Sequence, residues 1–85
     1  MQTEPISVYR RVWCEDSDAA VEHFREHGID YVEVDIEEDE EAGRGVMFIT
    51  GGHHITPTLV YRMQAIVFDP WDGERFERWW GLVNG

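Results

Sequence analysis

The segment of residues 31–36, with the sequence YVEVDI, alternates valine or isoleucine with acidic residues. This period of two predicts a β-strand. Residues 6–9 are short and β-rich and predict an earlier strand. Between them, residues 15–27 carry an apolar stripe at helical spacing, and Gly28 stands where a glycine commonly ends a helix. A strand, a helix and a strand in this order predict a crossover unit with two parallel strands.

The middle of the chain predicts a second helix and a hairpin. Residues 39–50 form the expected helix, and the acids before and within its first turn suit the positive end of its dipole. We expect three of its apolar residues to face inward: Val46, Met47 and Ile49. Residues 57–61 and 65–68 are two apolar runs separated by three residues, which predicts an antiparallel hairpin.

A third helix is predicted to begin at residues 69–72, with the sequence DPWD. Asp69 is the expected N-cap, Pro70 suits the first helical position, and Asp72 would follow at the third. Four apolar residues then continue at helical spacing and should pack on the sheet: Phe76, Trp79, Trp80 and Val83. The whole chain, residues 1–85, thus predicts one α/β domain, a three-layer sandwich of order β-α-β-α-β-β-α with a four-stranded mixed sheet.

The composition excludes several classes of protein. No run of 18 apolar residues is present, so no membrane span is expected, and the first residues do not resemble a secretory signal. Eighteen acidic residues against seven basic ones give a formal charge of −11, which disfavours binding to nucleic acid or to anionic membranes. One cysteine cannot form an internal disulfide. We therefore expect a monomeric cytoplasmic protein.

Cys14 is the only cysteine, and it lies where the first strand gives way to the first helix. A thiol at this place faces the positive end of the helix dipole, which favours the thiolate. The hydroxyl of Ser17 can share the same face of the first helical turn. A lone cysteine is also commonly a small buried hydrophobic residue, and position alone leaves both interpretations open.

The order of elements, with Cys14 after the first strand and Thr56-Pro57 before the third, resembles the glutaredoxin branch of the thioredoxin fold. Three local matches carry this resemblance: residues 8–9 and 12–14 (VY and VWC) resemble the approach to the family's active cysteine, residues 28–36 its second-strand signature, and residues 51–52 and 56–58 its glycine pair and cis-proline loop. Together they span residues 6 to about 80. The resemblance implies a thioredoxin-like fold.

The resemblance also implies an activity. Glutaredoxins exchange disulfides through an N-terminal active cysteine, in Cys-Pro-Tyr-Cys or, in monothiol members, Cys-Gly-Phe-Ser motifs. Cys14 takes the place of the nucleophile and Ser17 that of the second cysteine, so the pattern is monothiol. The implied active-site turn also includes Trp13, Glu15 and Asp16. Glutathione is the implied co-substrate, and glutathionylated or thiol-bearing proteins are the implied partners.

By the same resemblance, the backbone of Thr56, before a cis Pro57, would pair with the peptide of glutathione. Arg11 stands where many members carry a basic residue beside the thiol and would meet a glutathione carboxylate. The family's Gly-Cys-Asp-Asp turn, which binds the γ-glutamyl end, is missing, and residues 69–72 occupy its region. Asp72 is therefore the candidate there.

The acids around the thiol leave open two alternatives to the oxidoreductase, which is the first possibility. Glu15, Asp16 and Asp18 all lie within four residues of Cys14, and like charge raises the pKa of a thiol. The chain could then be a non-catalytic binding module that uses the groove between Cys14 and Pro57. A third alternative is a glutathione-dependent [2Fe–2S] carrier, which the anionic turn disfavours.

The four histidines are expected to be solvated and to bind no metal. His23 and His27 have the i, i+4 spacing of a chelating pair, but spacing alone fixes no third ligand. His53 and His54 lie in the loop before Pro57, where one of them could meet a substrate near the thiol.

Overall fold

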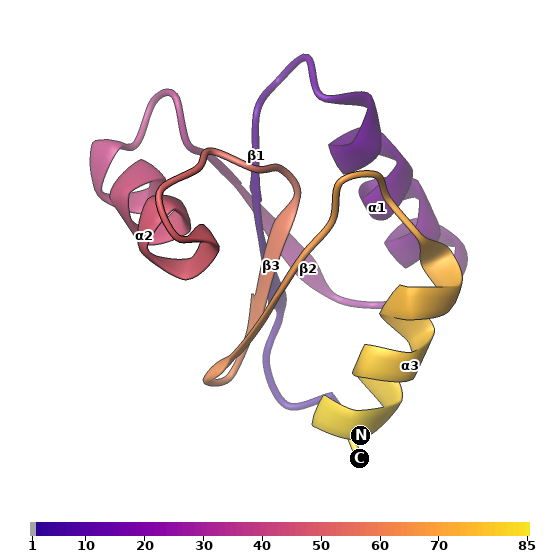
Figure 1. Cartoon of the computed structure of the whole chain (residues 1–85). Coiled ribbons are helices and arrows are strands. Elements are labelled where there is room, and N and C mark those ends of the chain that lie inside the picture. The colour runs from indigo at the N-terminus through magenta and orange to yellow at the C-terminus, as the bar shows by residue number, and fades with distance from the viewer. Residues whose placement is uncertain (1) are drawn as a thin grey trace.

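The computed structural model describes residues 2–85, which form a four-stranded sheet with helices on both faces (Figure 1). The elements are β1 (Ile6–Arg10), α1 (Glu15–Glu26), β2 (Tyr31–Asp35), α2 (Glu40–Thr50), β3 (Thr58–Tyr61), β4 (Gln64–Val67) and α3 (Gly73–Val83). The strand order is β2-β1-β3-β4, with β1 parallel to β2 and β3 antiparallel to β1 and β4. The predicted element order and mixed sheet are confirmed.

The main core lies between the sheet and the helices α1 and α3, which cover the same face, whereas α2 covers the other (Figure 1). Val8 of β1 is paired with Leu59 of β3, so their side chains share this inner face. Both are completely buried, together with Phe24 of α1 and Phe76 of α3. Burying one such side chain stabilises the fold by about 1.5–3 kcal/mol. This packing fixes where α1 begins and therefore where Cys14 lies.

The face under α2 is covered less completely. Val46 is buried as predicted, but Met47 and Ile49 are 38% and 39% exposed, so the prediction that they face inward was wrong. The reason is the close approach of α2 at Gly43, where a Cβ would lie 3.2 Å from the carbonyl oxygen of Ile36. This approach sets the rotation of α2 about its axis and leaves the side chains of Met47 and Ile49 partly exposed to solvent.

The start of α3 also differs from the prediction. Asp72 is the N-cap, and its side chain accepts a hydrogen bond from the backbone N–H of Arg75 at 3.1 Å. The helix begins at Gly73, so Pro70 lies before it rather than at its first position, and the Asp69–Pro70 peptide bond is cis. The prediction of Asp69 as N-cap was therefore wrong.

The turn between β3 and β4 has two residues, because Tyr61 pairs with Gln64. Turns of this length need a positive φ, and Arg62 supplies it at 57°. Its guanidinium donates to the hydroxyl of Thr3 and lies 5.1 Å from the Tyr61 ring centre. These contacts hold a residue other than glycine in the turn. None of the helices in residues 2–85 is long and apolar enough to cross a membrane.

Candidate active site

Cys14 is the N-cap residue of α1, with extended backbone angles and no hydrogen bond from its side chain to the helix end. Its carbonyl oxygen accepts the first helical bond, from the N–H of Asp18 at 3.1 Å. The sulfur therefore lies beside the free N–H groups of the first turn, where the helix dipole favours negative charge. The residue as a whole is 9% exposed.

The loop before β3 brings Thr56 against the sulfur. Its hydroxyl donates to Cys14 Sγ at 3.1 Å, and the thiol donates to the Thr56 carbonyl oxygen at 3.5 Å. The Thr56–Pro57 peptide bond is cis, as the resemblance implied, and Pro57 is buried. Residues 42 positions apart in the chain thus form one thiol site.

The pKa of the Cys14 thiol lies below its ordinary value. Burial by itself raises this pKa, but the hydrogen-bond donors that surround the sulfur outweigh it. These donors are first the hydroxyls of Ser17 and Thr56 and then the backbone N–H groups of Ser17 and Asp16. A larger share of Cys14 is therefore the reactive thiolate at neutral pH than in a free cysteine.

Ser17 has a special part in this balance. Its hydroxyl is completely buried and, within residues 2–85, has no partner in ordinary hydrogen-bond geometry. It is nevertheless the group that lowers the pKa of Cys14 most. A buried hydroxyl without a partner costs about 1–3 kcal/mol. Donating to an ionised sulfur removes that cost, which favours the thiolate over the thiol.

Arg10 neutralises one of the acids of the turn. Its guanidinium lies 2.6 Å from the Asp18 carboxylate and 3.0 Å from that of Glu33. It also donates to the carbonyl oxygens of Arg11 and Val12, which fixes the loop before Cys14. Asp18 therefore acts on the thiol as one member of an ion pair rather than as a lone negative charge.

Asp16 also has a partner. Its Oδ1 atom accepts a hydrogen bond from the backbone N–H of Trp71 at 3.1 Å, which ties α1 to the segment before α3. Glu15 is exposed to solvent, which screens its charge. The three acids thus do not outweigh the donors around the sulfur, since the net shift of the Cys14 pKa is downward.

A groove of about 260 Å³ opens beside the sulfur. It is lined by Arg11, Trp13, Cys14, Asp16, His54, Ile55, Thr56 and Asp69. The Arg11 guanidinium lies 5.4 Å from the centre of the Trp13 ring, and Trp13 is 68% exposed. Within residues 2–85, the backbone N–H of Thr56 donates to no group, so it can pair with an extended ligand.

The family model described as Glutaredoxin matches residues 6–66, which span the thiol turn, the cis-proline loop and most of the hairpin. The chain belongs to the glutaredoxin family. Comparison with curated protein sequences gives no match.

Two solved structures show the same fold as this glutaredoxin. A mutant of the thioredoxin-like protein BC3987 has a TM-score of 0.74 and 20% identity, over 89% of this chain and 94% of that one. A glutaredoxin from Archaeoglobus fulgidus has a TM-score of 0.72 and 19% identity, over 94% of this chain and 86% of that one. At these identities the likeness concerns the fold.

The groove of this glutaredoxin brings together five of the residues predicted to act: Arg11, Trp13, Cys14, Asp16 and Thr56. Ser17 and Pro57 are buried and do not line it, and Glu15 is exposed outside it. Asp72 caps α3 and does not line the groove either, so its role in substrate binding stays a prediction. Of the two loop histidines, His54 is the one that reaches the groove.

Asp69 and Ile55 line the groove but were not among the predicted site residues. The sequence held a signal for Asp69. The predicted hairpin pairs the end of β4 with the start of β3, and Phe68 indeed donates to the carbonyl oxygen of Pro57 at 3.0 Å. Asp69 must then lie beside Thr56. Nothing in the sequence indicates Ile55.

One chain cannot hold a [2Fe–2S] cluster in this groove by itself, so a glutathione-dependent carrier would need glutathione and a second protomer for the other ligands. Such clusters commonly take four thiolates, and this chain supplies the one of Cys14. Asp16 and Asp69 add negative charge beside an already anionic cluster. The residues suit thiol chemistry on a small polar ligand better.

Proposed function

We propose that this glutaredoxin is a thiol–disulfide oxidoreductase that acts on glutathione mixed disulfides by a monothiol mechanism through Cys14. The observation that carries the proposal is the environment of the Cys14 sulfur. The sulfur lies at a helix N-terminus, has hydrogen-bond donors around it that lower its pKa, and borders an open groove. These are the conditions under which a cysteine acts as a nucleophile at neutral pH.

The proposed reaction has two exchange steps. The Cys14 thiolate attacks the glutathione sulfur of a mixed disulfide, and the substrate thiolate leaves and takes a proton from water. The thiolate of a second glutathione then attacks the glutathione sulfur on Cys14, which gives oxidised glutathione and restores the Cys14 thiolate. Ser17 has no sulfur with which to resolve the intermediate, so the second glutathione is required.

Three groups along the groove support glutathione as the ligand. The free N–H of Thr56 would pair with the peptide of glutathione. Arg11 is the cation that would meet a carboxylate, and its contact with Trp13 holds it over the groove. Asp69 is an acceptor for the ammonium group of the γ-glutamyl end, in a place where we had expected Asp72 to act.

The test combines a titration with an assay. The thiol pKa of the wild type should lie below the value of about 8.5 for free cysteine. A glutathionylated peptide should be reduced in the presence of glutathione, and Cys14→Ser should lose this activity. An unshifted pKa together with a rate equal to that of Cys14→Ser would refute the enzyme proposal.

A second candidate function is peptide binding without catalysis. The observation that favours it is the combination of a buried sulfur and an exposed aromatic anchor, Trp13. In that case Trp13→Ala would abolish binding of a thiol-free peptide, and Cys14→Ser would leave the binding unchanged. We propose the cytoplasm as the site of either function, because the sequence has no disulfide framework.

A further inference from the structure

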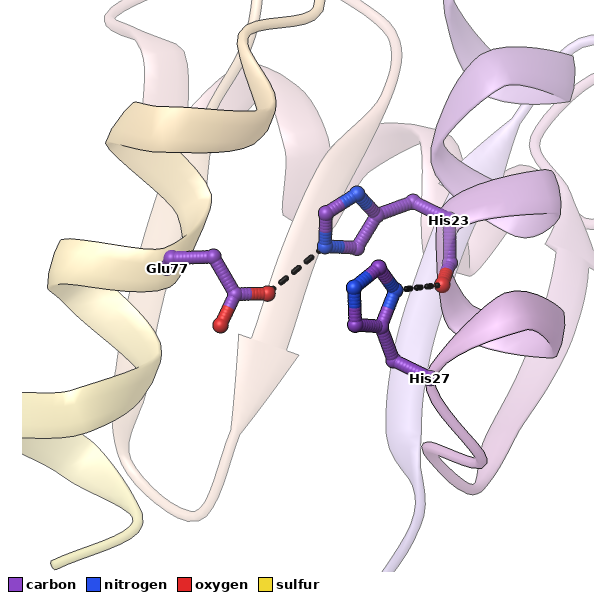
Figure 2. Close-up of side chains that lie close together, drawn as sticks. All are labelled: His23, His27 and Glu77. Carbon is purple, nitrogen blue, oxygen red and sulfur yellow. Dashed lines mark hydrogen bonds and ion pairs between the residues drawn. The ribbon is translucent and has the colours of Figure 1, made fainter.

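The helices α1 and α3 meet at a cluster of three side chains (Figure 2). His23 and His27 come from α1, and Glu77 comes from α3. Each offers one potential ligand atom, and these three atoms lie within 4.8 Å of one another. Among residues 2–85, this is the one group of three potential metal ligands that lie close together. It does not include Cys14.

His23 is held firmly in this cluster. Its Nε2 atom lies 2.6 Å from Oε2 of Glu77, and its side chain is only 17% exposed. The ring packs edge-on against Trp71 and Phe76, with centroids 5.6 and 5.3 Å away. A Cβ at Gly73 would lie 3.4 Å from the ring, so the start of α3 also confines it. The expectation of a solvated side chain was wrong for His23.

His27 is oriented by a hydrogen bond of its own. Its Nδ1 lies 2.9 Å from the carbonyl oxygen of His23. A carbonyl oxygen can only accept, so Nδ1 carries the proton, and in the neutral ring Nε2 keeps a free lone pair. Figure 2 shows this second nitrogen on the side of the ring that faces Glu77. A backbone carbonyl on the other nitrogen is the usual orienting partner of a metal-bound histidine.

The two histidine rings are stacked, with centroids 4.2 Å apart and planes at 18°. Their i, i+4 spacing places them on one face of α1, and Glu77 closes the set from α3. Two imidazoles and a carboxylate suit Zn²⁺ and its first-row neighbours, with bonds of about 2.0–2.2 Å. Tetrahedral ligand atoms then lie roughly 3.3 Å apart.

We propose that His23, His27 and Glu77 form a binding site for a divalent first-row transition-metal ion such as Zn²⁺. The ion replaces the hydrogen bond between His23 and Glu77 and joins α1 to α3. Three protein ligands leave the fourth position to water. The formal charge of −11 favours the approach of a cation.

The test is titration calorimetry with ZnCl₂ on the variant Cys14→Ser, because a thiol is itself a zinc ligand. This variant is the parent for the further substitutions. The expected result is one zinc ion per chain. Glu77→Gln keeps an acceptor for the His23 hydrogen bond but removes the charged ligand, and it should weaken binding at least tenfold, about 1.4 kcal/mol. His27→Gln should do the same. Both side chains are exposed, so neither change should disturb the core.

The matched control is the double variant His53→Gln/His54→Gln, which removes the exposed histidine pair of the loop and should bind zinc as the parent does. A second readout is the visible absorption of bound Co²⁺, which should appear in the parent and control and be absent in Glu77→Gln. Equal zinc affinity in Glu77→Gln and the parent, or no binding by the parent, would overturn the proposal. Because the parent lacks Cys14, either result is independent of the oxidoreductase activity.

Discussion

Ser17→Ala should raise the pKa of Cys14 and slow its reaction. The Ser17 hydroxyl is completely buried and is the group that lowers this pKa most. Alanine fills nearly the same space but has nothing to donate. The variant therefore removes one stabilising bond to the thiolate and leaves the helix, Thr56 and the groove in place.

The size of the effect follows from two magnitudes. A hydrogen bond to a charged group contributes about 1.5–3 kcal/mol, and one pKa unit corresponds to about 1.36 kcal/mol. The pKa of Cys14 should then rise, because this contribution to the thiolate is lost. At neutral pH the thiolate fraction, and with it the alkylation rate, should fall roughly tenfold or more.

The same variant changes how stability depends on pH. The folded pKa of wild-type Cys14 lies below its unfolded value, so the thiolate contributes stability that is fully present above the unfolded pKa. This contribution is lost as the pH falls through the folded pKa. In Ser17→Ala the gap between the two pKa values narrows, so stability should rise less with pH across this window.

The assay follows iodoacetamide alkylation against pH, with Cys14→Ser as the blank and chemical unfolding at two pH values beside it. Ser7→Ala is the matched control, because it removes a serine hydroxyl from β1 without touching the thiol site. The pKa of Cys14 in Ser7→Ala should equal the pKa of Cys14 in the wild type. A pKa in Ser17→Ala that is unchanged or lower would show that the buried hydroxyl does not stabilise the thiolate.

Two predictions concern the elements that frame the site, and both are measured by urea unfolding. Gly43→Ala should destabilise the fold by about 1 kcal/mol, because its Cβ would meet a backbone oxygen at 3.2 Å, whereas Gly45→Ala has open space and should stabilise it by about 0.5–1 kcal/mol. Equal changes in the free energy of unfolding at the two glycines would contradict the close approach of α2 to the carbonyl oxygen of Ile36. Asp72→Ala should cost about 0.5–2 kcal/mol through loss of the α3 cap, and Asp69→Ala should cost less, since Asp69 caps no helix. A larger loss at Asp69 would restore the sequence-based assignment of the cap.

Local patterns were sufficient to predict most of the fold. The alternation in β2 and the helix-ending glycine, Gly28 with φ of 63°, depend on neighbours in the sequence and need no tertiary contact. The position of Cys14 follows from them, because a strand and a helix on either side fix it at a helix N-terminus.

The structure differs from the sequence-based predictions where contacts between residues far apart in the chain determine the local arrangement. Asp69 and Asp72 both precede the apolar stripe of α3, and either could cap it by local criteria. The rotation of α2 depends on how closely Gly43 approaches the end of β2. Similarly, the contact between His23 and Glu77 joins residues 54 positions apart, so no spacing rule could supply the third ligand.

The acids of the active-site turn show why charge counted along the chain is a poor guide to a thiol's pKa. Repulsion depends on where each carboxylate lies and on what it already contacts. Asp18 is paired with Arg10, and Asp16 accepts a backbone N–H from the segment before α3. Both carboxylates thus hold the walls of the groove in place, while neutral donors around Cys14 set its pKa. An acidic turn and a reactive thiol are therefore compatible in this fold.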